Sequence, residues 1–426
     1  MSNSFHTGFV CVSCGARFAP GQTDGACPAC GGNLDATYDY ARIGREVDPR
    51  AIADATDRSI WRFAPFLPVD PARALDGAGD VIRQVGNSPL IRARRLEARL
   101  GAQAIWLKDD GRLPSASFKD RASAMVVARA IEAGRTVIAT ASSGNAAAAL
   151  AVMSACAGPQ AVIFVPRTTP EGKLSQMLIH GARVYVVDGT YDDAVRMCAE
   201  ACAKFGWWNR STGVNPFTRE GKKTAGLEIA EQLGRAEGGA PFRAPDAVIV
   251  PVGDGNIISG VCKGFRELFA AGWIEAMPRF YGVTATLAPS LYRAWQAGVE
   301  TFDLIEATTI AGGISVDRPN DGAMAIRAVR DTGGIFIEAT DAEMLAAMSD
   351  LAQSEGVFVE PACAAAWVGL EKALTNGLIR PDEEVVLQLT GSGLKDIRSA
   401  LAAAADPGRS VGAMTLTRSR CKFDQV

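Results

Sequence analysis

One lysine, Lys119, stands in a setting that suits covalent chemistry. The stretch from Pro114 to Arg121 reads Pro-Ser-Ala-Ser-Phe-Lys-Asp-Arg. Ser117 followed by Asp120 has the form of a helix capping box, and apolar residues continue after it at helical spacing. Lys119 is therefore expected in the first turn of a helix, whose dipole disfavours the protonated amine. Such an amine can form a Schiff base with an aldehyde cofactor, and a solvated lysine beside an Asp/Arg pair is the alternative.

Four cysteines near the N-terminus have the spacing of metal ligands. Two Cys-X-X-Cys pairs are separated by twelve residues and are flanked by glycines that suit tight turns. Four thiolates bind Zn²⁺ tetrahedrally and leave no open position, so the expected site is structural. Redox pairs are the alternative. The expected ligands are Cys11, Cys14, Cys27 and Cys30, within a zinc-ribbon-like segment over residues 1–36.

Composition is that of an ordinary soluble globular protein. The chain has 426 residues, is 48% hydrophobic and carries a formal net charge of -3. This balance does not indicate binding to nucleic acid or a membrane surface, and no apolar run is long enough to span a bilayer. The start has no pattern of a secretory signal, and only four of the ten cysteines fall at paired spacing. A reducing, cytoplasmic setting is expected.

From Thr136 onward, short apolar stretches alternate with stretches of helical periodicity. Strands that are apolar on both faces and separated by helices predict a parallel sheet covered on both sides. A ligand is expected at the polar ends of such strands. The predicted strands cover residues 104–108, 137–140, 161–165, 184–187, 247–252, 279–284, 334–338 and 385–389.

A glycine-containing turn follows one of these strands. Gly253-Asp-Gly-Asn256 leads directly into a predicted helix, where backbone N–H groups can converge on a phosphate. A plain connection is the alternative. Asp254 argues for that alternative, because a carboxylate repels a phosphate unless it points away.

Five motifs follow one another along the chain: Ser117 to Arg121, Ser142 to Asn145, Gly253 to Asn256, Glu360-Pro361 and Thr390 to Asp396. In this order they resemble the threonine synthase family of fold-type II pyridoxal-phosphate enzymes. The likeness covers nearly the whole chain, including Trp61-Arg62 and the cysteine-rich start. It implies a two-lobed α/β fold like that of the tryptophan synthase β chain, with parallel-rich sheets covered by helices. The implied domains are a large cofactor-binding domain (37–110 plus 220–426) and a smaller mobile domain (111–219).

The resemblance also implies roles for single residues. Lys119 would bind the cofactor aldehyde and later move protons, and Asn145 would hydrogen-bond the ring hydroxyl. Phe118 would pack near the ring, and Thr390 would face the ring nitrogen. A hydroxyl there does not enforce a pyridinium, which favours prompt loss of a leaving group. Gly253, Asp254, Gly255 and Asn256 would hold the cofactor phosphate, while Ser142 and Ser143 would lie near the substrate carboxylate.

One stretch departs from the family pattern. Threonine synthases resemble one another in an Asn-Ser pair followed, one residue on, by Asn-Pro-aromatic-Arg, which grips the substrate phosphate. Here residues 212–219 read Thr-Gly-Val-Asn-Pro-Phe-Thr-Arg, so that Thr218 stands at the arginine position. Losing a bidentate arginine would cost about 1.5–3 kcal/mol of binding. Arg219, Lys222 and Lys223 are candidates to replace it, and Thr218 and Arg219 are the predicted substrate contacts.

The expected function is that of a pyridoxal-phosphate-dependent amino-acid lyase. Lys119 would take the α-proton of a small amino acid and drive loss of a side-chain substituent. Water would then release a keto acid and ammonia, or a nucleophile would add. The alternatives are a true threonine synthase, which converts O-phospho-L-homoserine and water to L-threonine and phosphate, and a non-catalytic zinc-ribbon scaffold. The expected partners are a small amino acid and, from the family, a second copy in a homodimer, without nucleic acid or membrane.

Some charged and thiol side chains have a structural interpretation. Glu228, Glu231 and Arg235 have the pattern of a solvated helix face. Cys198 and Cys202 share a helix face but are expected in the core rather than in a second metal site. Two histidines in the whole chain make a histidine-based triad improbable.

Overall fold

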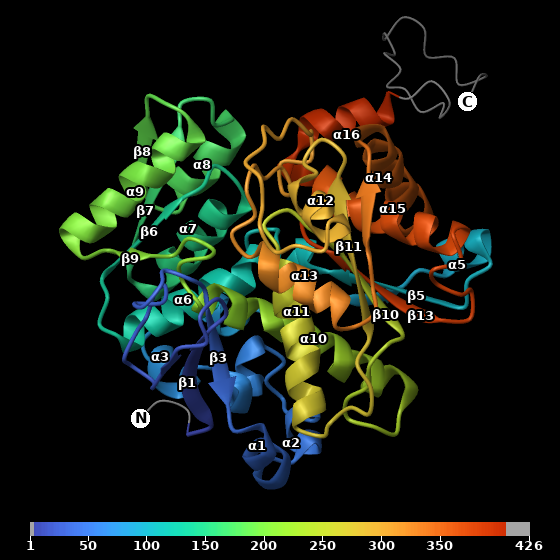
Figure 1. The fold of residues 1–426 in the computed structure, drawn as a ribbon, viewed down its shortest axis with the longest axis horizontal. Helices are drawn as coiled ribbons and strands as arrows, with labels where there is room; N and C mark the ends of the chain where they lie inside the picture. The colour runs from blue at the N-terminus through green and yellow to red at the C-terminus, as the bar shows by residue number, and fades with distance from the viewer. Residues whose placement is uncertain (1–3, 406–426) are drawn as a thin grey trace, which may run out of the picture.

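A computed structural model of the chain describes residues 4–405. Two α/β lobes stand side by side, and the N-terminal segment packs below them (Figure 1). Three separate sheets organise the chain, with three, six and four strands. No helix within residues 4–405 has the length and apolar character needed to cross a membrane.

The six-stranded sheet forms the centre of the larger lobe. Five of its strands are parallel, and only β4 runs antiparallel to its neighbour β5. The predicted parallel sheet is therefore confirmed. In spatial order the strands are β12 (Phe336–Ala339), β11 (Arg279–Ala285), β10 (Ala247–Pro251), β13 (Glu384–Leu389), β5 (Ala104–Asp109) and β4 (Leu90–Arg92).

Alternate side chains of each strand point into two different hydrophobic cores, one on each face of this sheet. Helices therefore cover both faces. Val248 and Val250 of β10 belong to the core beneath one set of helices, whereas Ile249 belongs to the other. This alternation is the period-two pattern of a strand buried on both faces. The first face carries α10 (Phe217–Glu237), α11 (Asn256–Ala270), α12 (Ser290–Gln296) and α13 (Gly322–Arg330); the second carries α5 (Arg94–Leu100), α14 (Asp341–Glu355), α15 (Pro361–Thr375) and α16 (Ile397–Ala404).

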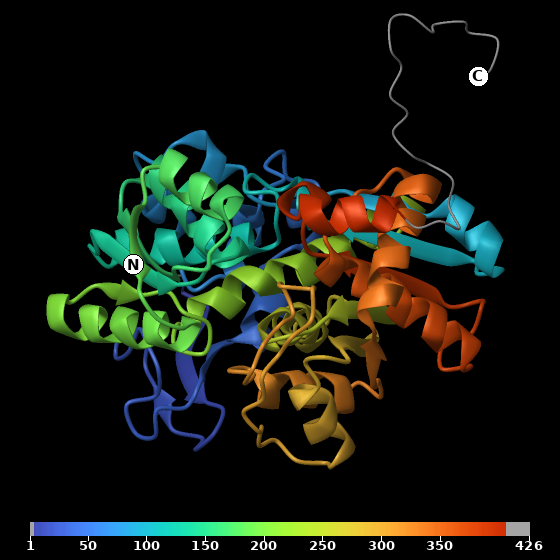
Figure 2. The same cartoon turned by 90° about the horizontal axis from the view of Figure 1, so that it is seen from above.

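The four-stranded sheet of the smaller lobe is parallel throughout. In Figure 2 the light green helix α9 lies apart from the other helices of this lobe, and its Ala194 and Cys198 pack on the opposite face of the sheet from α6 and α7. Cys198 is thus a core residue, as predicted. The strands are β8 (Arg183–Val187), β7 (Gln160–Pro166), β6 (Val137–Ala141) and β9 (Trp208–Asn209); the helices are α6 (Lys119–Glu132), α7 (Asn145–Ala157), α8 (Glu171–Ile179) and α9 (Tyr191–Phe205).

The N-terminal sheet is small and antiparallel. Its buried Phe9 ring meets Phe217 of α10 edge to face at 5.7 Å, which seats this sheet on the main body. In spatial order its strands are β2 (Arg17–Phe18), β1 (His6–Cys11) and β3 (Leu34–Tyr38). The short helices that follow are α1 (Tyr40–Glu46), α2 (Pro49–Ala53), η1 (Ile60–Phe66), α3 (Pro71–Ala74) and α4 (Asp80–Arg83). Two further short helices, η2 (Asp110–Arg112) and η3 (Gly393–Lys395), come later in the chain. The division at residues 36, 110 and 219 stays a prediction.

Helix α6 begins at Lys119, but the predicted capping box is wrong. Phe118 occupies the N-cap position and makes no side-chain cap hydrogen bond. The carboxylate of Asp120 instead accepts from the backbone N–H of Ser115 at 2.6 Å. Ser117 pairs with Gly391 as an antiparallel bridge, and this extended pairing commits it to the neighbouring segment.

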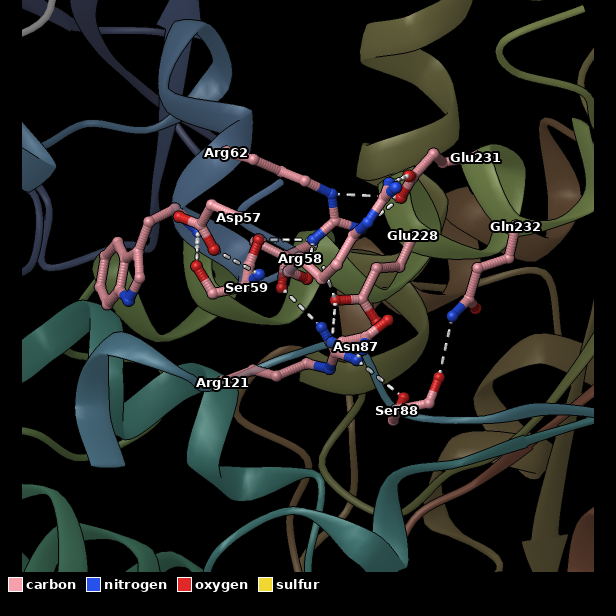
Figure 3. A network of polar contacts seen from close by, with 12 residues as sticks. Asp57, Arg58, Ser59, Arg62, Asn87, Ser88, Arg121, Glu228, Glu231 and Gln232 are labelled. Carbon is pink, nitrogen blue, oxygen red and sulfur yellow. Dashed lines mark hydrogen bonds and ion pairs between the residues drawn. The ribbon is translucent and has the colours of Figure 1, made fainter. Parts of the chain in front are cut away.

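The predicted solvated face of α10 is wrong for Glu228 and Glu231, which are completely buried, whereas Arg235 is exposed as predicted. Glu228 pairs with Lys108 and with Arg121, both at 2.7 Å, and Glu231 pairs with Arg62. Figure 3 shows Arg62 and Arg121 reaching toward Glu231 and Glu228 of α10 from different sides. Helix α10 is surrounded by η1, α6, α11 and β5, so its charged residues find protein partners instead of water.

Candidate active site

Lys119 lies where two distant segments of the chain are joined. The backbone N–H of Phe118 donates to the carbonyl of Thr390 at 2.9 Å, and that of Ser392 donates to the carbonyl of Ala116 at 3.1 Å. Thr390 is the first residue after β13, at the carboxyl edge of the large sheet. The structure therefore brings Phe118, Lys119 and Thr390 together, and places them where parallel sheets bind ligands.

The amine of Lys119 is in surroundings that favour its neutral form. Burial lowers the pKa of this amine; Glu360 opposes the shift, and the guanidinium of Arg210 adds to it. A lysine with a lowered pKa is a better nucleophile at neutral pH. Burial is the leading cause of this lowered pKa. The sequence, which placed Lys119 in the first turn of a helix, did not reveal that cause.

Asn145 and Glu360 join the two lobes across the site. Asn145 is the first residue of α7, and its Nδ2 donates to both carboxylate oxygens of Glu360 at 2.9 and 3.2 Å. Glu360 caps α15, and burial raises the pKa of its carboxyl group. The Glu360-Pro361 motif was noted in the sequence but carried no assigned role. Its contact with Asn145 makes Glu360 a member of the site.

The turn from Gly253 to Asn256 connects β10 to α11 and leaves no room for side chains at its glycines. Gly255 has φ of +90°, and a Cβ atom there would lie 2.7 Å from the carbonyl oxygen of Asp321. A Cβ atom on Gly253 would lie 2.7 Å from the Cα of Ile314. One carboxylate oxygen of Asp254 accepts from the backbone N–H of Asn320 at 2.7 Å. This bond commits one oxygen of Asp254 to a neighbouring loop, which weakens the objection to a phosphate at this turn.

Two further cations are buried close to Lys119. Lys222 of α10 donates from Nζ to the side-chain oxygen of Asn256, and burial, then Lys119 and Arg210, hold its pKa well below the usual value. Arg210 is 1% exposed and donates to Ser123 at 3.2 Å. Its Nε has no partner within residues 4–405, and burial lowers its pKa to about 10. These three neighbouring basic side chains have incomplete sets of partners, so together they could hold an anion.

Lys222 was one of three candidates in the sequence, and Arg210 was not recognised. A signal existed, because Arg210 directly follows a buried strand at its polar end, just after Trp208 and Asn209. Lys223 is committed elsewhere: its Nζ pairs with Glu220 at 2.5 Å and with Glu267 at 2.8 Å.

The predicted substrate contacts Thr218 and Arg219 have other partners in this structure. The hydroxyl of Thr218 donates to the carbonyl of Asn215 at 2.8 Å. Arg219 donates to the carbonyl of Leu34 at 2.8 Å and to Asp35 at 2.9 Å, both in β3. Their contact with substrate stays a prediction, whereas Lys222 lies with Lys119.

Ser142 and Ser143 open the loop between β6 and α7. Both are partly exposed, and the hydroxyl of Ser142 accepts from the backbone N–H of Gly144 at 3.2 Å. The loop ends at Asn145, beside the contact with Glu360. Their role toward a substrate carboxylate stays a prediction.

These residues fit pyridoxal phosphate. Lys119 offers an amine for the aldehyde, and the glycine turn at the start of α11, with Lys222, offers N–H groups and charge for the phosphate. Asn145 and Thr390 offer polar groups for the ring. When bound, the cofactor would supply an electron sink for a carbanion next to the substrate amine. The fold and the site together define a two-lobed pyridoxal-phosphate enzyme.

Comparison with known proteins agrees with this class. The family described as "Pyridoxal-phosphate dependent enzyme" matches residues 81–391. The threonine synthase of Methanosarcina acetivorans is 35% identical over 399 residues, 93% of this chain and 94% of that protein. The threonine synthase of Methanocaldococcus jannaschii is 36% identical over 401 residues, 93% of this chain and 95% of that protein. The chain belongs to the pyridoxal-phosphate-dependent enzymes and, within them, to the threonine synthase family.

Solved structures share the fold. Processed threonine deaminase isoform 2 from Solanum lycopersicum superimposes with a TM-score of 0.64 at 24% identity, over 78% of this chain and 85% of that one. Maize serine racemase has a TM-score of 0.63 at 22% identity, over 74% of this chain and 94% of that one. The predicted two-lobed fold is confirmed.

The four N-terminal cysteines form a compact cluster. Their sulfur atoms all lie within 4.8 Å of one another, with Cys11 and Cys30 at 3.5 Å and Cys14 and Cys27 at 3.8 Å. With Zn–S bonds of about 2.3 Å, sulfurs at the corners of a tetrahedron lie about 3.8 Å apart. The cluster therefore has the dimensions of a tetrahedral thiolate site.

Proposed function

We propose that the protein removes the α-proton of a small amino acid and expels a substituent from its side chain, followed by release of a keto acid and ammonia or by replacement. The observation that carries this proposal is the partly buried Lys119, whose amine has a lowered pKa beside the hydroxyl-bearing end of β13. An amine in this state can bind the cofactor and, once displaced by substrate, accept the α-proton. Thr390 beside the ring favours prompt departure of a leaving group.

The buried guanidinium of Arg210 supports a substrate with an anionic side-chain substituent. An anionic group beside it would supply the missing partner of its Nε. This observation favours a second candidate, the reaction named for the relatives, in which O-phospho-L-homoserine and water give L-threonine and phosphate. In that case Arg210 would replace the arginine that is absent at Thr218.

Steady-state assays distinguish the two candidates. The purified enzyme is given O-phospho-L-homoserine, L-serine or L-threonine, and the release of phosphate, keto acid and ammonia is measured. Keto acid from L-serine or L-threonine at rates above those with O-phospho-L-homoserine supports elimination on another amino acid. Rapid phosphate release together with L-threonine, and no keto acid from the other two, establishes the synthase reaction instead.

We further propose that the four cysteines hold a structural Zn²⁺ and that the enzyme works as a homodimer in the cytoplasm. The sulfur spacing and the absence of disulfides among the described residues support the metal site and a reducing compartment. Zinc content by atomic absorption, together with the mass of the native particle in solution, tests both the metal and the dimer.

A further inference from the structure

The cysteine cluster is connected to the cofactor side of the molecule through Asn33. Asn33 follows the second cysteine pair, and its backbone carbonyl accepts from the N–H of Val12, which lies within the first pair, at 2.9 Å. The carbonyl of Gly32 accepts from the N–H of Cys27 at 2.8 Å, and the N–H of Gly32 donates to the sulfur of Cys30 at 3.4 Å. The position of Asn33 therefore depends on the conformation of both cysteine pairs.

The side chain of Asn33 leaves the cluster and reaches the larger lobe. Its Nδ2 donates to the carboxylate of Asp321 at 2.7 Å and to the carbonyl of Asn320 at 2.8 Å. The other carboxylate oxygen of Asp321 accepts from Asn256, and the oxygen of Asn256 accepts from Lys222. An unbroken series of polar contacts thus runs from the cysteine cluster to Lys222.

The segment held by Asn33 also shapes the glycine turn. The backbone N–H of Asn320 donates to the carboxylate of Asp254 at 2.7 Å. The backbone N–H of Asp321 donates to the carbonyl of Asp254 at 3.0 Å. Asp321 is 1% exposed and lies directly against Gly255. A buried carboxylate at this place repels a phosphate unless hydrogen bonds hold it away and offset its charge. Asn33 supplies one of these bonds.

We propose that Asn33 is a positioning residue through which the filled four-cysteine site orders the phosphate cradle of the cofactor at Gly253 to Asn256. The inference rests on the proposed assignment of that turn to the cofactor phosphate. Metal in the cluster holds Asn33 against Asp321, and Asp321 then holds Asn256 and Lys222 in the arrangement that binds phosphate. By linkage, the metal and pyridoxal phosphate increase one another's affinity.

The test compares Asn33→Ala with Asp24→Ala in the full-length chain. Asp24 also tethers the cysteine-rich segment to the main body, through Arg129 at 3.2 Å, but it takes no part in the contacts to Asp321. Each protein is freed of cofactor with hydroxylamine, assayed for zinc and titrated by absorbance with pyridoxal phosphate and, separately, with pyridoxal. Pyridoxal has the same aldehyde but no phosphate, so it reports on Lys119 alone.

Asn33→Ala is expected to weaken pyridoxal phosphate binding about three- to tenfold, the size of one ordinary hydrogen bond, because Asn33 acts on the phosphate only through Asp321, while leaving pyridoxal binding and zinc content unchanged. Asp24→Ala is expected to change neither affinity. Equal weakening of both aldehydes, no weakening, or the same effect from Asp24→Ala would overturn the proposal. A wild-type protein that binds no pyridoxal phosphate at all would instead overturn the assigned function, and this inference with it.

Removal of the metal provides an independent arm. A chelator is expected to weaken pyridoxal phosphate binding in the wild type and to have little further effect in Asn33→Ala, because both changes break the same connection. Additive effects would show that the metal acts by another route and would refute the role of Asn33.

Discussion

Two buried clusters of charge in this protein differ in how completely their members are paired. Around Glu228, Arg121 pairs with both Glu228 and Asp110, and Lys108 pairs with Glu228. Despite burial, these cations hold the pKa of Glu228 well below its usual range and the carboxylates raise that of Arg121, whereas burial still lowers the pKa of Lys108. The charged forms of Arg121 and Glu228 therefore stabilise one another.

The cluster around Lys119 behaves in the opposite way. Burial lowers the pKa of Lys119, Lys222 and Arg210 alike, and the last keeps a buried Nε without a partner in residues 4–405. The comparison teaches that burial of charge alone does not mark a functional site. A complete set of partners marks a structural cluster, and an incomplete set marks a place prepared for an anionic ligand.

The largest expected effect belongs to Lys119. Lys119→Ala should abolish turnover, the visible absorbance of the lysine imine and its bleaching by borohydride, because the residue supplies both the attachment and the proton transfer. Absorbance spectra and initial rates check this result. Lys204→Ala, at an exposed lysine of α9, is the control and should retain both. Residual turnover of the alanine variant near the wild-type rate would remove Lys119 from the mechanism.

Breaking the complete cluster should reduce stability strongly. Glu228→Gln leaves Lys108 and Arg121 buried with one carboxylate fewer, which should lower the free energy of unfolding by about 3–5 kcal/mol. Urea denaturation of the apoprotein measures this change. Glu46→Gln removes the exposed partner of Arg42 and should cost less than about 1 kcal/mol. Equal costs for the two variants would contradict the distinction between buried and exposed pairs.

Breaking the incomplete cluster should affect binding more than stability. Arg210→Met removes a buried cation without leaving a carboxylate unpaired, so the stability of the apoprotein should stay the same or rise. The KM for a substrate with a phosphate-bearing side chain should increase about ten- to a hundredfold, as for loss of a charge-assisted contact. Rates and thermal melts are compared with those of Arg196→Met, an exposed control on α9. A large loss of stability with unchanged KM would make Arg210 a structural residue.

The smallest expected effect is on the pH dependence of stability, through the buried carboxyl group of Asp120. Burial raises the pKa of this carboxyl group from 3.8 to about 7, the opposite of the shift at Glu228. The folded protein therefore keeps a proton that the unfolded chain releases, and the contribution of Asp120 to stability falls as pH rises from about 4 to 7. Asp120→Asn should gain stability relative to the wild type between pH 5 and pH 8, measured as the difference in Tm. A difference that does not change with pH would show that Asp120 is already ionised.

The elements of the fold were largely predictable because their signals are local. The strands β6, β7, β10 and β13 lie where short apolar runs end at polar residues. A site whose residues have a fixed spacing in the sequence was equally predictable, because the four cysteines do form one cluster. The start of α6 was also correct, although its cap was not, because Ser117 pairs with a segment that follows it by more than 250 residues.

The sequence by itself determined where the chemistry-bearing residues stand on their strands, turns and helices, since spacing and hydrophobic period depend only on neighbours along the chain. Only the tertiary structure decided which charges are paired. The partners of Glu228 lie 107 and 120 residues away, and the contact of Asn33 with Asp321 spans 288 residues. Whether a buried charge is compensated depends on what the fold packs against it, and that packing separates the structural cluster on α10 from the cations that surround Lys119.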